Sequence, residues 1–167
     1  MLLLLTSYIQ DLSESDFERP YLLLCDEAER FFHGSELSKQ FIITCYRTWR
    51  KFNSGIWCMS QNYKDFVGDK ELADSLLPNA PNLIVLRQRK INWSDFQETF
   101  DFNEAQVETI KSLDIVKGEY AEMYLQQDDK QAVLRIVPEP LSHWICTSDG
   151  NDKAKIVETQ RKHPELS

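Results

Sequence analysis

The sequence predicts an α/β domain in which helices flank a mostly parallel sheet and a β-hairpin lies near the C-terminal end. Short apolar runs alternate with longer segments whose apolar residues recur every three or four positions, and two β-rich runs later surround a polar turn. Strands and helices that alternate in this order favour right-handed crossovers and parallel pairing. The 167 residues, 42% apolar and 28% charged, are enough to bury one substantial core.

Residues 1–19 are expected to form a helical lead-in, because the apolar residues Leu2, Leu5, Tyr8, Ile9 and Leu12 recur at helical spacing. The apolar run at 1–5 is too short to span a membrane and lacks the basic flank of a signal peptide.

The run at 21–25 is continuously apolar, which is typical of a strand buried on both faces of a parallel sheet. The three-to-four spacing over 36–52 predicts a long helix, and the polar residues at 53–55 end it. The apolar run at 56–59 predicts the second strand.

The remaining elements are predicted from the same patterns, with Asn103 as an N-cap and Gln106 at the third position of its helix. These elements are helices at 70–77, 103–113 and 151–162, a third strand at 83–86, a hairpin of strands at 120–125 and 132–137, and a short apolar piece at 144–147.

Two acidic residues, Asp26 and Glu27, directly follow the first apolar run. The carboxyl end of a buried strand faces the crevice where α/β sheets bind ligands. A carboxylate there suits Mg²⁺, which prefers oxygen ligands, and a second one can activate water as a general base. The alternative is a strand followed by a solvated acidic turn.

The second run ends in Ser60 and Gln61. A polar amide at the end of a neighbouring strand can orient the attacking water in phosphoryl transfer. Together with Asp26 and Glu27, Gln61 therefore predicts a nucleotide site at one edge of the sheet.

The charge and cysteine content limit the class of protein. A net charge of −8 argues against direct nucleic acid binding, which requires a basic surface. The four cysteines show no C-x-x-C pair, so reduced thiols in a reducing cytoplasm are expected.

Motifs at 20–28, 50–53, 59–61, 77–80, 118–120 and 141–149 follow one another along the chain. This ordered set resembles the large ATPases of type IV secretion and conjugation, and the segment at 141–149 is most similar to the TraC-type subgroup that assembles conjugative pili. The resemblance extends from about residue 20 to 162.

The resemblance implies a RecA-like P-loop NTPase core that binds ATP and Mg²⁺. By position, Asp26 would bind Mg²⁺ and nucleotide, Glu27 would activate water, Gln61 would sense the γ-phosphate, and Arg50 would contact nucleotide. Arg50 is also one of four candidates for an arginine finger, which reaches the nucleotide of a neighbouring subunit. The candidates are Arg47, Arg50, Arg87 and Arg89, and a solvated or helix-capping role is the alternative for each.

The resemblance also implies partners and a location. Family members form hexameric rings at the cytoplasmic base of a secretion channel, so this chain is expected to be cytoplasmic and peripheral to the bacterial inner membrane.

No G-x-x-x-x-G-K-[ST] motif occurs in the sequence, whose five glycines are too dispersed to build a phosphate loop. The 167 residues are therefore expected to be the C-terminal, Walker B part of a RecA-like ATPase domain without the Walker A strand. An upstream half with the phosphate loop is the expected partner, and the chain alone is expected to be inactive.

Three other functions remain open at this point. Asp26, Glu27 and Ala28 could belong to a DEAD/DEAE-type helicase, the chain could be a non-catalytic interaction module of a secretion apparatus, or the acidic pair could decorate an unrelated α/β domain.

Overall fold

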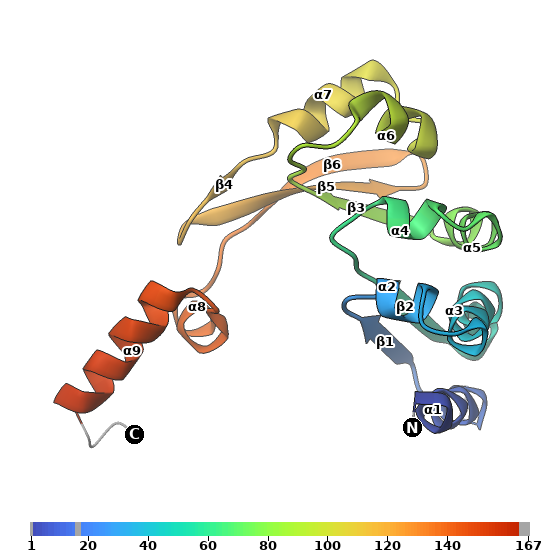
Figure 1. Ribbon diagram of the computed structural model, residues 1–167, viewed down its shortest axis with the longest axis horizontal. Helices are drawn as coiled ribbons and strands as arrows, with labels where there is room; N and C mark the ends of the chain where they lie inside the picture. The colour runs from blue at the N-terminus through green and yellow to red at the C-terminus, as the bar shows by residue number, and fades with distance from the viewer. Residues whose placement is uncertain (1, 16–17, 164–167) are drawn as a thin grey trace. The chain divides into compact units, whose positions relative to one another are not determined.

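The computed structural model describes residues 2–15 and 18–163, which form two compact units (Figure 1). In the described chain, the first unit extends to Leu83 and includes Ser94–Asp101, and the second comprises Ile84–Trp93 and the residues from Phe102 onward.

The helices and strands follow the predicted alternation over the first half of the chain. The helices are α1 (Leu2–Ser15), α2 (Glu29–Phe32), α3 (Glu36–Thr48), η1 (Trp49–Phe52), α4 (Lys64–Val67), α5 (Lys70–Leu76), η2 (Leu77–Asn79), α6 (Trp93–Phe100), α7 (Glu104–Ser112), α8 (Pro140–Cys146) and α9 (Gly150–Lys162). The strands are β1 (Tyr21–Cys25), β2 (Ser54–Cys58), β3 (Asn82–Leu86), β4 (Ile115–Val116), β5 (Tyr120–Gln127) and β6 (Lys130–Ile136).

The first unit contains a parallel pair, β1 and β2, in the register Tyr21↔Ser54 to Cys25↔Cys58. The prediction that β1 is buried on both faces is wrong for the described chain, because Leu22 and Leu24 are 59% and 57% exposed. The apolar run specifies two apolar faces, but the described helices cover only the face that carries Cys25.

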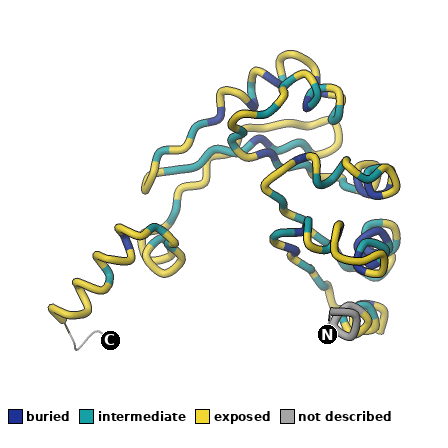
Figure 2. Tube along the Cα trace, viewed as in Figure 1, coloured by how far each residue is buried: buried dark blue, intermediate teal, exposed yellow. Residues whose placement is uncertain are grey.

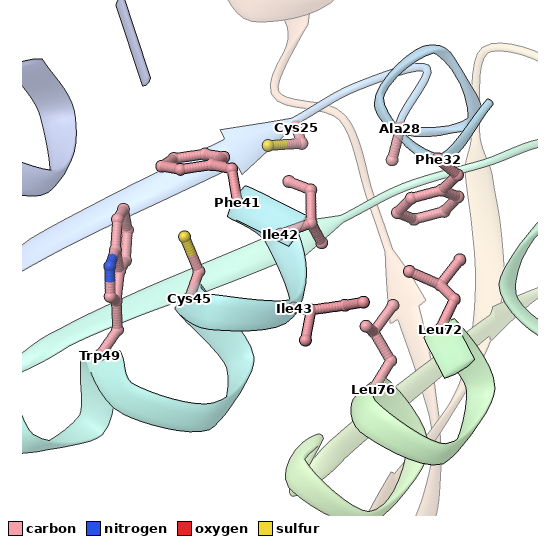
Figure 3. Packing of buried hydrophobic residues seen from close by; sticks show 10 residues of the cluster. All are labelled: Cys25, Ala28, Phe32, Phe41, Ile42, Ile43, Cys45, Trp49, Leu72 and Leu76. Carbon is pink, nitrogen blue, oxygen red and sulfur yellow. The ribbon is translucent and has the colours of Figure 1, made fainter. Parts of the chain in front are cut away.

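The core of the first unit lies between this face of the sheet and the helices α2, α3 and α5 (Figure 3). Helix α3 contributes more of its residues than any other element, because apolar residues at three-to-four spacing lie on its buried side (Figure 2). The largest buried side chain is Trp49, which packs edge to face on Phe41 with ring centroids 6.0 Å apart.

The long helix predicted over 36–52 is confirmed, and its last turn tightens into the 3₁₀ helix η1. Asn53 ends it in the left-handed conformation, with φ of 51°. Asparagine is among the few residues that adopt this conformation readily, which explains the sharp entry into β2.

Within the predicted lead-in at 1–19, helix α1 spans Leu2–Ser15 and residues 18–19 form a bend, while positions 1, 16 and 17 lie outside the described residues. The predicted apolar stripe is only partly correct. Ile9 packs against the core, whereas Tyr8 and Leu12 are exposed.

Lys39 of α3 binds three carboxylates and thereby joins α3 to α5. Its Nζ lies 3.1 Å from Asp69 Oδ2, 3.1 Å from Glu71 Oε2 and 3.2 Å from Glu36 Oε2. Asp69 also caps α5 by accepting a hydrogen bond from the Leu72 backbone N–H.

Asp69 should make the first unit sensitive to acid. The Leu72 N–H and then Lys39 lower the pKa of Asp69 from its ordinary value of 3.8. The stability it contributes is therefore complete above that value and is lost as the pH falls through the lower pKa of the folded state. Asp69→Asn, which keeps a capping side chain, should lose less stability than the wild type when unfolding is measured from pH 6 down to about 3. Asp74→Asn in the same helix is the control, and equal acid sensitivity of wild type and Asp69→Asn would contradict this assignment.

The second unit is built on an antiparallel sheet in which β3, β4 and β6 all pair with β5. The predicted hairpin is confirmed as β5 and β6, in register from Ala121↔Ile136 to Gln127↔Lys130. The strand predicted at 83–86 also forms, but as β3 it joins β5 and does not extend the parallel sheet. An apolar run specifies a strand without specifying its partner, because ladder hydrogen bonds come from the backbone.

Helix α7 begins at the predicted N-cap, where Asn103 and Gln106 form a complete capping box. The Gln106 side chain also donates to Tyr124 Oη of β5 at 2.9 Å, and Phe102 packs edge to face on the Tyr124 ring. The apolar piece predicted at 144–147 lies largely within helix α8, which Glu139 caps.

Candidate functional site

The carboxyl ends of β1 and β2 lie side by side at one edge of the parallel sheet. The last registered pair is Cys25 with Cys58, and two backbone hydrogen bonds continue the pairing beyond it. Met59 N donates to Cys25 O at 2.9 Å, and Ala28 N donates to Met59 O at 2.9 Å. The segments that follow the two strands therefore leave the sheet together.

Asp26 and Glu27 occupy the first of these segments. Asp26 is exposed, and its Oδ1 accepts a hydrogen bond from the Glu27 backbone N–H at 2.9 Å. Glu27 is half-buried and has a left-handed backbone with φ of 51°. This conformation costs a residue with a side chain roughly 1–2 kcal/mol, and such strain clusters at functional sites.

The Glu27 carboxylate forms an ion pair with Arg30 of α2, with 2.7 Å between Oε2 and Nη2. The Arg30 side chain is 76% exposed and the Glu27 side chain 45% exposed, so water screens the pair and it opens readily. The Glu27 carboxylate is thus oriented by Arg30 but is not held tightly by it.

Gln61 lies in the second segment and is exposed. The preceding residue, Ser60, donates a hydrogen bond to Asp65 Oδ2 and accepts one from the Asn62 backbone N–H at 3.2 Å. Asn62 Oδ1 in turn accepts from Lys64 N at 3.1 Å, which starts α4. These local bonds hold the backbone on both sides of Gln61.

A contact that the sequence did not predict joins the two segments. His33, which directly follows α2, has its Nε2 3.8 Å from Asp65 Oδ1. The sequence spacing of residues 33 and 65 gives no indication that they lie close together. The turn at Ser60 and Asn62 was the available signal, since serine and asparagine side chains favour such turns.

A thiol pair lies directly beneath this edge. A hydrogen bond between the Cys25 and Cys58 side chains lowers the pKa of Cys25 and raises that of Cys58. The buried Cys45 of α3 lies nearby, and burial raises its pKa.

The structure does not bring Arg50 to this edge. Arg50 is exposed in η1, just before the amino end of β2, whereas Asp26 and Gln61 follow the carboxyl ends. Among the other candidate arginines, Arg47 donates to Ser75 Oγ of α5 at 2.6 Å, and Arg87 pairs with Asp114 at 2.9 Å. Arg87 and Arg89 belong to the second unit.

The residues at the edge fit the metal side of a nucleotide site. Mg²⁺ is usually held by one or two carboxylates together with waters and substrate phosphates, and the exposed carboxylate of Asp26 suits this role. Within the described chain, no cluster of three or more His, Cys, Asp or Glu side chains could hold a metal ion by itself. A magnesium ion here would take its remaining ligands from nucleotide and water.

None of the helices in the described residues has the length and apolar character needed to cross a membrane.

Comparison with solved structures shows the fold. The structure of VirB4 of Thermoanaerobacter pseudethanolicus matches with a TM-score of 0.64 and 20% identity, covering 84% of this chain. The match spans 37% of the VirB4 chain, so this chain corresponds to a little over a third of that protein. No match was found among the curated proteins.

The family comparison covers the whole chain. The family described as the TraG P-loop domain matches residues 1–167. Together with the fold match, it confirms the predicted α/β, RecA-like class and the resemblance to conjugation and type IV secretion ATPases. The chain belongs to the TraG P-loop domain family.

Proposed function

We propose that this chain supplies the Walker B side of an ATP-hydrolysing site in a conjugation or type IV secretion motor. The observation that supports the proposal is that the segment with Asp26 and Glu27 and the segment with Gln61 follow the carboxyl ends of two paired parallel strands. In open α/β sheets this edge is where ligands bind.

The three residues have chemically distinct tasks in the proposed site. Asp26 offers an exposed carboxylate to Mg²⁺, which when bound neutralises charge on the phosphates. Glu27 releases Arg30, and its carboxylate accepts a proton from the attacking water. The Gln61 side chain hydrogen-bonds the same water and orients it toward the terminal phosphoryl group.

The uncovered face of the parallel sheet supports the proposal that another polypeptide segment packs against this chain. Leu22, Leu24 and Trp57 lie on that face by register and are 59%, 57% and 47% exposed. Parallel sheets normally have both faces covered. We propose that an upstream, P-loop-bearing half of the same protein covers this face and supplies the phosphate loop.

The assembled motor would follow the pattern that the resemblance implies. We propose a homo-oligomer, with a hexamer expected, that works on the cytoplasmic side of the bacterial inner membrane with type IV secretion channel components, in TraC-type pilus assembly. In such a ring, Arg50 would have to act on a neighbouring subunit, because it lies at the opposite end of β2 from Asp26. The charge of −8 makes direct nucleic acid binding unfavourable.

The test compares ATP hydrolysis by the 167-residue chain with hydrolysis by a longer polypeptide that joins it to an upstream segment containing G-x-x-x-x-G-K-[ST]. The chain alone should show no turnover, since its sequence lacks the G-x-x-x-x-G-K-[ST] motif that cradles the phosphates. The longer polypeptide should hydrolyse ATP when Mg²⁺ is present. An inactive longer polypeptide, at concentrations where it assembles, would favour the non-catalytic interaction module.

A further inference from the structure

Two cysteines face each other across the parallel strands, directly before the candidate site. Cys25 ends β1, Cys58 ends β2, and they are register partners. Registered residues of neighbouring strands point their side chains to the same face of the sheet, at a strand spacing of about 4.8 Å. This spacing lies within the range of roughly 4.4–6.8 Å between Cα atoms that disulfides span.

The burial of the two thiols differs in a way that matters for reactivity. Cys25 is 4% exposed and belongs to the core, whereas Cys58 is partly exposed and packs against that core from its rim. A small oxidant can therefore reach Cys58, while Cys25 is held beside it and shielded from bulk solvent.

We propose that Cys25 and Cys58 are a redox modification site at which peroxides form a reversible disulfide. One sulfur of the pair attacks a peroxide oxygen, the O–O bond breaks, and a sulfenic acid and one water result. The other sulfur then attacks the sulfenic sulfur, so that the S–S bond forms and the S–O bond breaks, releasing a second water. The two thiols lose two electrons and two protons, and hydrogen peroxide is reduced to two waters.

Closing this bond should strain the sheet. Disulfides prefer Cβ atoms roughly 3.5–4.5 Å apart, slightly less than the strand spacing of about 4.8 Å, so the two strand ends must move closer together. Strained disulfides are easily reduced and belong to the labile class. The bond would draw together the strand ends next to Asp26 and Ser60, and its formation does not depend on the proposed ATPase activity.

The experiment treats the whole chain with hydrogen peroxide, blocks the remaining thiols and maps tryptic peptides by mass spectrometry. Each cysteine lies on a different tryptic peptide, 1–30 for Cys25, 40–47 for Cys45, 52–64 for Cys58 and 136–153 for Cys146. We expect peptides 1–30 and 52–64 to be joined in the monomeric chain, with a mass two hydrogens below their sum, and to separate after dithiothreitol treatment.

Two variants assign the bond. Cys45→Ala removes the third thiol of the same core and should leave the 1–30 to 52–64 link intact. Cys58→Ala should abolish it. The proposal is overturned if Cys25 links to Cys45 instead, if the only disulfides join Cys146 between molecules, or if Cys58 is oxidised to sulfinic acid without any link.

Discussion

Replacing Glu27 with glutamine is expected to lower the ATP turnover of the longer, P-loop-containing polypeptide by about 10²- to 10⁴-fold, the range of a lost general base. Glutamine keeps the size and hydrogen-bonding capacity of the side chain but does not accept a proton from water. Nucleotide affinity should change little, because Glu27 acts on water and not on the phosphates. The measurement is steady-state hydrolysis together with equilibrium binding of ATP.

Glu98→Gln is the matched control for this substitution. Glu98 lies on α6 and is exposed. Its replacement by glutamine removes one negative charge, as Glu27→Gln does. It should leave turnover within about twofold of the wild type. If Glu27→Gln hydrolysed ATP as fast as Glu98→Gln, Glu27 would not be the general base.

Removing the Trp49 side chain is expected to destabilise the first unit by about 3–5 kcal/mol, the usual cost of truncating a buried aromatic residue. Trp49 is 1% exposed and packs on Phe41 at the end of the long helix. Trp49→Ala would leave a cavity where α3 and η1 meet the core, and total domain stability is only about 5–15 kcal/mol. Urea unfolding followed by far-UV circular dichroism measures the change.

Trp57→Ala is the matched control, because Trp57 is 47% exposed on the uncovered face of β2. In the isolated chain it should cost less than about 1 kcal/mol. If the two variants lost equal stability, the core would not lie on the side of the sheet where the structure places it.

The elements with long, regular patterns were predictable from the sequence. The helix over 36–52 and the hairpin around Asp128 and Asp129 follow from periodicity and turn chemistry, and the structure confirms both. The capping box at Asn103 and Gln106 was also predictable, because its two partners are three residues apart.

The short elements and the strand partners were not predictable. Helices α2 and α4 have four residues each, too few to show a helical period. Helix α6 is held by contacts distant in sequence, such as the Tyr63 hydroxyl that donates to Asp95 Oδ2 at 2.5 Å. The pairing of β3 with β5 likewise depends on tertiary structure that no local pattern encodes.

The candidate site residues could be proposed from the sequence, but the contacts that hold them in place could not. Asp26, Glu27 and Gln61 stand out because each follows an apolar run, and parallel pairing brings the ends of those runs together. The contacts of Glu27 with Arg30 and of Asp65 with Ser60 and His33 depend on the left-handed turn and the local loop geometry. Arg50 was singled out through resemblance alone, and the structure places it at the opposite end of β2.

The most direct test of the proposed site is the Mg²⁺ dependence of ATP binding at Asp26. Affinity for a non-hydrolysable ATP analogue is measured with and without Mg²⁺, for the longer polypeptide and its Asp26→Asn variant. The site predicts that Mg²⁺ strengthens binding in the wild type and that Asp26→Asn loses most of this strengthening, on the order of tenfold or about 1.4 kcal/mol. Equal strengthening by Mg²⁺ in both proteins would show that the ion is held elsewhere and would contradict a Walker B role for this edge.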